Sequence, residues 1–168
     1  MTLSNTVILE VDGHEYIPRD IHFHWGRNDT QGSEHSINSR KYSLEMHIVC
    51  YNSKYGSVAE AKFFKDGILV IESVEVGVKL FWKRKLCAFN LGEFLNVDAL
   101  RKGSFVVYNG SFTTPPCYED VTWVIPLKVN SIDKRKMNFF REIQGLDGRL
   151  VDNYRPIQPI NTRKCLVG

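Results

Sequence analysis

Two histidines one residue apart, His22 and His24, lie in the apolar stretch "IHFHWG" at residues 21–26. Side chains two residues apart on a β-strand point to the same face, so both imidazoles would share one face with the carboxyl group of Asp20. A third histidine, His47, lies in "SLEMHIVCY" at residues 43–51 and would share a face with Glu45. If the two strands pair, three imidazoles converge. Three histidines with one open position form the ligand set of catalytic zinc sites, whereas structural sites are closed by four protein ligands.

The carboxylates of Asp20 and Glu45 are natural partners for the outer N–H groups of such ligands, because a carboxylate there fixes the tautomer and orientation of the ring. Taken alone, these features remain open to other readings. A His-x-His pair occurs often by chance, and a single strand histidine is more often a satisfied core or surface group. Cupin-type metal sites also begin with His-x-His, but they need a glutamate where Asn28 and Asp29 stand.

The remaining chain must supply elements that hold these two strands. Asp12-Gly13 is the favoured dipeptide of a type I′ hairpin turn between "TVILEV" and "HEYI". Residues 67–76 and 121–129 are rich in β-branched residues and predict further strands. Pro126 indicates an edge position or a bulge in the second of these.

Three short helices are also expected. Residues 57–64 suit a helix stopped by Asp66-Gly67, and residues 91–101 suit a short helix or turn. Residues 131–143 form the best helix pattern, with Ser131 as the N-cap. Four residues can share its apolar face: Ile132, Phe139, Phe140 and Ile143.

Composition excludes several classes of protein. The 168 residues suit one domain, 43% of them are apolar, and the net charge of +3 is too small and too scattered to indicate a nucleic-acid partner. We expect no transmembrane segment, because no run of 18 apolar residues occurs, and residues 1–13 lack the pattern of a signal peptide. The four cysteines form no Cys-x-x-Cys pair.

Five separated motifs resemble those of the α-class carbonic anhydrases, in the order of that family. They are "FHWG" (23–26), "GSEHSIN" (32–38), "KYSLEMHIVCYNSKYGS" (41–57), "YNGSFTTPPCYEDVTW" (108–123) and "VDNYRPIQP" (151–159). The resemblance implies a single, mainly β domain over residues 1–168. Its expected architecture is a central, twisted, largely antiparallel mixed sheet with a few short peripheral helices.

The sequence departs from the family in three places. The N-terminal part of the family domain is absent, including the segment that usually carries the proton-shuttle histidine, so we expect a truncated domain. The stretch between Gly77 and Tyr108 is shorter than in the family. Glu72 stands where the family normally has a small or apolar residue.

The resemblance implies that His22, His24 and His47 bind Zn²⁺, which activates water for the reversible hydration of carbon dioxide to bicarbonate and a proton. Thr113 matches the threonine that accepts a hydrogen bond from the attacking hydroxide, and Glu34 matches the glutamate that accepts the threonine proton. This pair would orient the nucleophile toward the substrate. Sulfonamide-type inhibitors are expected to bind, and the chain is expected to be a monomer.

Further roles follow from the same resemblance. Asn153 and Arg155 would support the site from behind, while His35 would be structural. Asp20 stands where the family often has glutamine, and its negative charge would raise the pKa of the bound water. A dry pocket for carbon dioxide would be lined by six residues: Val49, Val70, Phe112, Thr114, Val121 and Trp123.

Two questions stay open at the level of sequence. A catalytically weak or inactive carbonic-anhydrase-like binding module is the alternative to an enzyme; the complete histidine set opposes it, and the missing N-terminal part favours it. The compartment is also open. Cys117 matches a cysteine that is disulfide-bonded in secreted family members, and sequons begin at Asn28 and Asn109, which favours an extracellular setting, whereas the missing signal peptide keeps the cytoplasm open.

Overall fold

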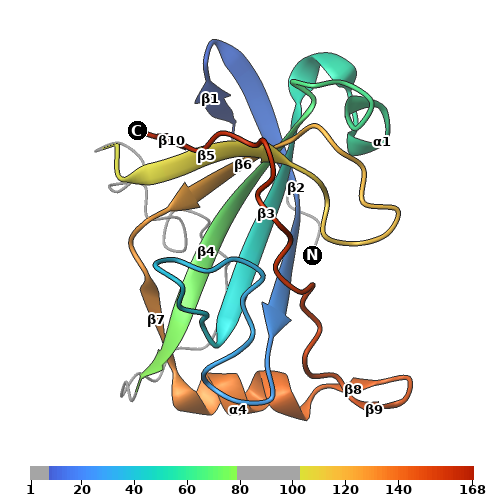
Figure 1. The fold of residues 1–168 in the computed structure, drawn as a ribbon. Coiled ribbons are helices and arrows are strands. Elements are labelled where there is room, and N and C mark those ends of the chain that lie inside the picture. The colour runs from blue at the N-terminus through green and yellow to red at the C-terminus, as the bar shows by residue number, and fades with distance from the viewer. Residues whose placement is uncertain (1–7, 79–102) are drawn as a thin grey trace.

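The computed structural model describes residues 8–78 and 103–168, with the side chains of residues 74–78 left aside. Most of the described residues in helices and strands belong to one curved sheet whose strands follow the spatial order β1-β2-β3-β4-β6-β5-β10, with β7 beside β4 (Figure 1). Strand β4 pairs in parallel with β6 and β7, and the other pairs of this sheet are antiparallel. The expected mainly β architecture, with a mixed and largely antiparallel sheet, is therefore confirmed.

The strands differ widely in length, and the longest ones build the centre of the sheet. Their bounds are: β1 Leu9–Val11, β2 His14–Trp25, β3 Leu44–Asn52, β4 Ile68–Val78, β5 Phe105–Gly110, β6 Val121–Pro126, β7 Asn130–Asp133, β8 Gln144–Gly145, β9 Gly148–Arg149 and β10 Leu166–Val167. The helical elements are short and peripheral: the 3-10 turn η1 Ser53–Tyr55, α1 Val58–Ala61 and α4 Lys134–Glu142. In the described part of the chain no helix has the length and apolarity that crossing a bilayer requires.

The first hairpin forms as the sequence predicts. Asp12 and Gly13 connect β1 to β2 with φ angles of 51° and 76°. Positive φ at both central residues is the signature of a type I′ turn, whose twist matches that of the flanking strands. The turn thereby sets the register in which β2 leaves toward β3.

The two faces of the central sheet carry different kinds of residue. On β3 the side chains of Met46 and Ile48 lie fully buried in an apolar cluster, whereas Glu45 and His47 point to the opposite face. Burying each of these apolar side chains stabilises the fold by about 2 kcal/mol. The apolar face thus anchors the strand while the other face remains available for polar chemistry. The core cluster on the apolar face comprises Tyr16, Ile21, Met46, Ile48, Cys50, Leu69, Ile71 and Val124.

The prediction for residues 131–143 was wrong at its beginning and in part of its apolar face. Residues 130–133 form β7, and the helix α4 is capped by Asp133, whose carboxylate accepts from the backbone N–H of Arg135. Ser131 therefore lies in a strand, because pairing with β4 outweighs its capping preference. Phe139 is 70% exposed, and Met137 occupies the buried position of the helix.

Three other expectations need correction or fall outside the described residues. Pro126 marks neither an edge nor a bulge: β6 lies between β4 and β5, and Pro126 is its last residue. A proline at the end of a strand removes only the last donor of the ladder, so the strand stops there. The helix at 57–64 is confirmed only over Val58–Ala61, with Ser57 as its N-cap. The element expected at residues 91–101 lies outside the described residues.

Candidate metal centre

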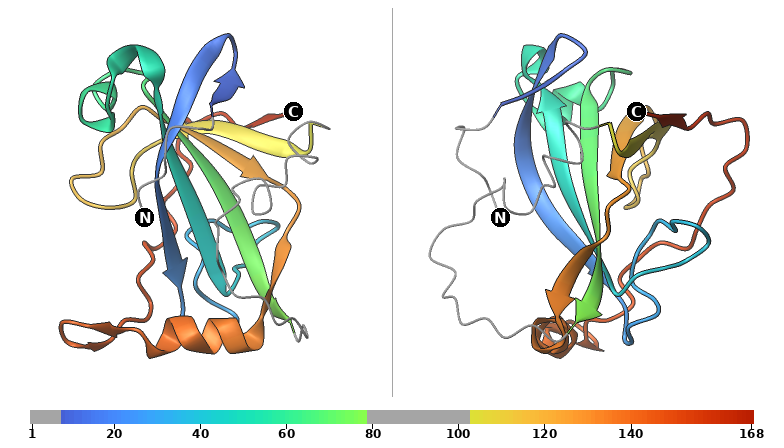
Figure 2. Two further views of the ribbon diagram at one scale, coloured as in Figure 1. Left: turned by 180° about the vertical axis from the view of Figure 1, so that it is seen from behind. Right: turned by 90° about the vertical axis from the view of Figure 1, so that its left-hand side faces the viewer.

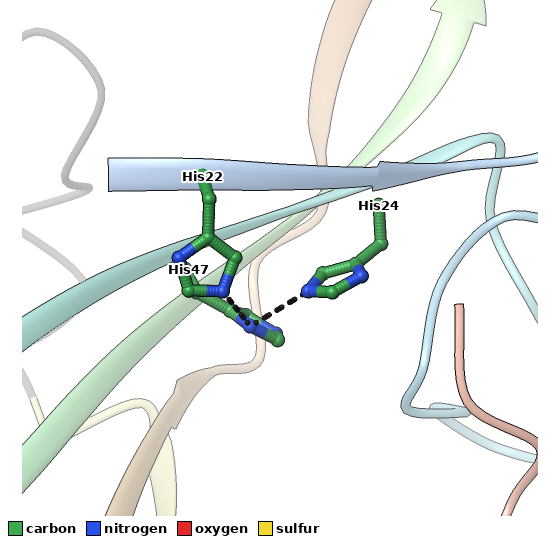
Figure 3. A group of neighbouring side chains, drawn as sticks. All are labelled: His22, His24 and His47. Atoms are coloured by element: carbon green, nitrogen blue, oxygen red, sulfur yellow. Dashed lines mark hydrogen bonds between the residues drawn. The ribbon is translucent and has the colours of Figure 1, made fainter. Parts of the chain in front are cut away.

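Three imidazoles meet where β2 and β3 pair. The antiparallel register places His22 opposite His47, and His24 follows two residues later on the same face. Nε2 of His22 and Nε2 of His24 each lie 3.2 Å from Nδ1 of His47 (Figure 3). His24 and His47 are buried, and His22 is half-buried. The structure thus brings together the three histidines predicted as zinc ligands.

The spacing of these nitrogens fits a tetrahedral zinc ion. Two ligands at the usual Zn–N distance of about 2.0–2.1 Å subtend about 3.3 Å in a tetrahedron, and the ligand atoms of this group all lie within 4.8 Å of one another. Burial lowers the pKa of His47 to about 4, although Glu45 opposes this shift. His47 is therefore neutral near pH 7, and neutral imidazole is the form that binds a metal.

Each of the three imidazoles has an acceptor at its outer nitrogen. Nδ1 of His22 lies 2.7 Å from Oδ2 of Asp20, and Nε2 of His47 lies 2.6 Å from Oε1 of Glu45. Nδ1 of His24 lies 2.8 Å from the backbone oxygen of Asn153. If each outer nitrogen carries the proton, each inner nitrogen presents a lone pair to the common point.

Asn153 also fixes the strand that carries two of the imidazoles. Its side-chain oxygen accepts from the backbone N–H of Trp25 at 2.7 Å, and its amide nitrogen donates to the carbonyl of Phe23 at 3.1 Å. The two contacts flank His24 on β2, so Asn153 holds the backbone on both sides of this residue.

Glu45 connects the imidazoles to the loop between β2 and β3. Its Oε2 accepts from the backbone N–H groups of Glu34 and His35, both at 2.8 Å, while Oε1 faces His47 and, at 2.9 Å, Nδ1 of His35. Burial alone would raise the pKa of Glu45, but the charge and hydrogen bonds of His35 and His47 hold it well below its usual range. This carboxylate therefore stays ionised although it is fully buried.

Sequence reasoning noted Glu72 as unusual but did not find its partner. Glu72 lies on β4 opposite His47 of β3, fully buried, and its Oε2 comes within 2.8 Å of Nδ1 of His35. The approach is that of an ion pair without hydrogen-bond geometry. Burial raises the pKa of Glu72 to about 7, with the charge of Glu45 adding to the effect. Burial would lower the pKa of His35, but Glu72 and Glu45 together raise it well above its ordinary value.

The expected hydrogen bond between Thr113 and Glu34 is not formed among the described residues. Instead, Oε1 of Glu34 accepts a hydrogen bond from the backbone N–H of Arg155 at 2.6 Å. The same oxygen lies 3.4 Å from Nδ1 of His24. Its Oε2 is buried without a hydrogen-bond partner in the described part of the chain. Thr113 is half-buried in the turn after β5, and both residues line one cavity of about 430 Å³.

The residues predicted to form an apolar wall lie near one another. Val49, Val70, Val121 and Trp123 belong to one buried cluster, and Phe112 packs against it. The ring of Trp123 lies 4.8 Å from that of His47, which places this cluster beside the imidazoles. Thr114, by contrast, is exposed, and its carbonyl accepts from the N–H of Cys117. None of these six residues lines the 430 Å³ cavity.

Comparison with known proteins agrees with the fold. The family described as eukaryotic-type carbonic anhydrase matches residues 2–167. The chain therefore belongs to the carbonic anhydrase family.

Both carbonic anhydrases and a carbonic anhydrase-related protein are similar to the chain in sequence. The chain is 34% identical to the human carbonic anhydrase-related protein over 90% of its own length, 38% identical to bovine carbonic anhydrase 3 over 88%, and 34% identical to rat carbonic anhydrase 5B, mitochondrial, over 89%. It spans only 61%, 64% and 53% of the lengths of these three relatives.

Proposed function

We propose that the chain catalyses the zinc-dependent, reversible hydration of carbon dioxide to bicarbonate and a proton. One observation carries this proposal: three imidazole nitrogens converge at 3.2 Å spacings, and each outer nitrogen faces an oxygen acceptor. Zinc held there by His22, His24 and His47 would act as a Lewis acid and make water a nucleophile near neutral pH.

The residues around the imidazoles would keep this ligand set in place. Glu45 remains ionised and holds the ring of His47, while Asn153 holds β2 on both sides of His24. Two of the three imidazoles are buried, which removes competing water from the ligand nitrogens. Glu45 and Asn153 would therefore position the imidazoles, and the burial of the site would exclude solvent from the ligand nitrogens.

Thr113 and Glu34 are proposed to orient the attacking oxygen. Glu34 Oε2 is a buried acceptor that lacks a partner among the described residues, and leaving such a group unsatisfied costs about 1–3 kcal/mol. Thr113 lines the same cavity, and its hydroxyl would satisfy Glu34 Oε2 by donating to it. A Thr113 hydroxyl that donates to Glu34 can only accept from the nucleophile, which fixes the direction of attack.

The apolar cluster around Trp123 suits carbon dioxide as the substrate. Val49, Val121 and Trp123 form a buried apolar cluster next to His47, and such surroundings favour a small apolar molecule over water. Phe112 adds bulk to this wall.

A second candidate function is binding without turnover, and two observations favour it. Glu72 adds a buried carboxyl group to the network behind His47, and the human relative carries the name carbonic anhydrase-related protein. In this case the module would hold zinc and present its surface to another molecule without hydrating carbon dioxide.

Zinc content and carbon dioxide hydration, measured on the same preparation, separate these functions. About one zinc per chain, with hydration that a sulfonamide inhibits, supports the enzyme, whereas zinc without hydration supports the binding module. His47→Ala should remove zinc, and His14→Ala, at the hairpin turn, serves as the matched control. Zinc content that His47→Ala leaves unchanged would refute the ligand set.

A further inference from the structure

The 430 Å³ cavity extends well beyond Thr113 and Glu34. It lies between the sheet at β5 and β6 and the segment of residues 155–165, and we name it the β5 cavity. This segment runs along the same side of the sheet as the loop between β2 and β3 (Figure 2). The volume falls within the range of about 300–1,000 Å³ that is typical of small-molecule sites.

Two arginines of the cavity wall have no carboxylate partner among the described residues. Arg27, Arg135 and Arg141 each pair with an aspartate, but Arg155 and Arg163 form no ion pair in the described part of the chain. Both are half-buried, so water cannot fully solvate their charges. A partly buried guanidinium without a counter-charge is unfavourable, and an anion in the cavity would relieve this.

Both guanidinium groups lie at the same end of β5. Nη1 of Arg155 is 3.4 Å from Oγ of Ser111, and Cζ of Arg163 lies 5.9 Å from the ring centroid of Tyr108. Nε and Nη2 of Arg163 donate to the carbonyls of Ile160 and Pro159, which fixes the plane of the group and leaves the donors of Nη1 without a partner in the described part of the chain. The free N–H donors of the two guanidinium groups can donate to the oxygens of one carboxylate.

Aliphatic side chains form a continuous part of the remaining wall of the β5 cavity, beside polar residues that include Glu34 and Thr113. Val106 and Ile125 come from the sheet, and Ile157 and Ile160 come from the segment opposite. Ile157 and Ile160 are 53% and 58% exposed, so an apolar ligand would cover hydrocarbon that now faces solvent. These walls disfavour a multiply charged ligand such as phosphate, because it would leave charge facing hydrocarbon.

We propose that the β5 cavity binds a small organic carboxylate with an apolar body, such as a medium-chain fatty acid. The carboxylate would lie at Arg155 and Arg163, and the alkyl chain would lie along Val106, Ile125 and Ile157. This site uses none of the three imidazoles. It shares Thr113 and Glu34 with the site proposed for the hydration of carbon dioxide, but binding of the carboxylate there requires no zinc.

Octanoate is the probe, and its binding to the full chain is measured by isothermal titration calorimetry. A saturating sulfonamide is present so that octanoate does not bind at the proposed metal centre. Octanoate should bind, and 1-octanol should bind roughly tenfold or more weakly because it lacks the charge. Arg155→Gln and Arg163→Gln should each weaken octanoate binding roughly ten- to hundredfold. Lys164→Gln is the matched control, since it removes the same charge at an exposed neighbouring position outside the cavity.

Alkylation of Cys165 locates the ligand. Cys165 lines the β5 cavity with an exposed free thiol, whereas Cys117 does not line it. Octanoate should slow the alkylation of Cys165 relative to that of Cys117. Peptide mass mapping measures the extent of alkylation at each cysteine. Absence of octanoate binding to the folded chain, or equal affinity for octanol, would overturn the proposal. It would also be overturned if the Arg155→Gln and Arg163→Gln variants are folded, as checked by circular dichroism, and bind octanoate as tightly as Lys164→Gln does.

Discussion

Glu45 and His47, two residues apart on β3, are joined by a 2.6 Å hydrogen bond between Nε2 of the imidazole and Oε1 of the carboxylate. Because Glu45 stays ionised, Nε2 keeps the proton and Nδ1 presents its lone pair to His22 and His24. This bond selects the tautomer that the metal centre needs.

Glu45→Gln should therefore weaken zinc binding. The glutamine keeps the volume but removes the charge that fixes the His47 tautomer, and loss of such a partner typically lowers metal affinity by about 10–100-fold. Competition with a chromogenic chelator measures this change. Glu119→Gln, at an exposed position outside the β5 cavity, is a control that removes the same charge. An affinity equal to that of the unaltered chain would show that Glu45 does not act through His47.

Thr113→Ala should lower the rate of carbon dioxide hydration by roughly 100-fold, because the nucleophile loses its orienting acceptor. Thr113→Ser keeps the hydroxyl and should retain most of the rate. Both variants should bind zinc like the unaltered chain, which metal analysis verifies. If the alanine and serine variants are equally active, the hydroxyl has no orienting role.

Asp20→Gln should shift the pH–rate profile toward lower pH by roughly half a unit. The carboxylate of Asp20 lies 2.7 Å from Nδ1 of His22, so its negative charge is transmitted toward the metal centre. Its half-exposed position lets solvent screen part of this effect. Stopped-flow hydration across pH 6–9 records the profile, and a profile that does not move to lower pH would contradict the assignment.

Glu72→Gln should make the fold more stable than the unaltered chain at pH 8. The gain in the free energy of unfolding should be roughly 2 kcal/mol larger at pH 8 than at pH 5. Burial raises the folded-state pKa of Glu72 to about 7 from 4.5. The protonated carboxyl therefore favours the folded state fully below pH 4.5, and this contribution is lost as the pH rises through 7. Urea unfolding of the two chains at both pH values measures the difference. A difference that is the same at pH 5 and pH 8 would argue against a neutral buried Glu72.

Buffer should accelerate turnover, because every histidine of the chain is already accounted for. Of the five, three are proposed ligands, His35 lies in the buried network, and His14 begins β2. Eight residues of strand separate His14 from His22, which corresponds to about 26 Å. No histidine is thus placed to carry protons from the metal centre, and imidazole buffer at rising concentration should increase the hydration rate. A rate independent of buffer would indicate another proton carrier.

Strand periodicity explains why the centre of the site could be predicted from sequence. Alternation in residues 21–26 places His22 and His24 on one face of a strand, and alternation in residues 43–51 places His47 on one face of a second strand. Only the register that brings them together remained to be found. Asn153 was recognised through motif resemblance, since a contact across 129 residues leaves no local pattern.

Features that depend on tertiary packing could not be predicted in the same way. Ser131 is a good N-cap by propensity, but because β7 pairs with β4, the N-cap is Asp133 and the helix begins at Lys134. Likewise, the approach of Glu72 to His35 arises between a strand and a loop that are 37 positions apart, and no spacing rule connects them. The β5 cavity depends on the path of an irregular segment, which carries no periodic signal.

The clamp that Asn153 places on β2 also sets an order of events during synthesis. Both strands with the three imidazoles leave the ribosome some hundred residues before the residue that locks them. Until Asn153 emerges, Nδ1 of His24 lacks its acceptor, and the part of β2 that carries His22 and His24 is paired only with β3. A nascent chain can thus pair its strands early, but it acquires a fully preorganised set of ligands only after Asn153 has emerged.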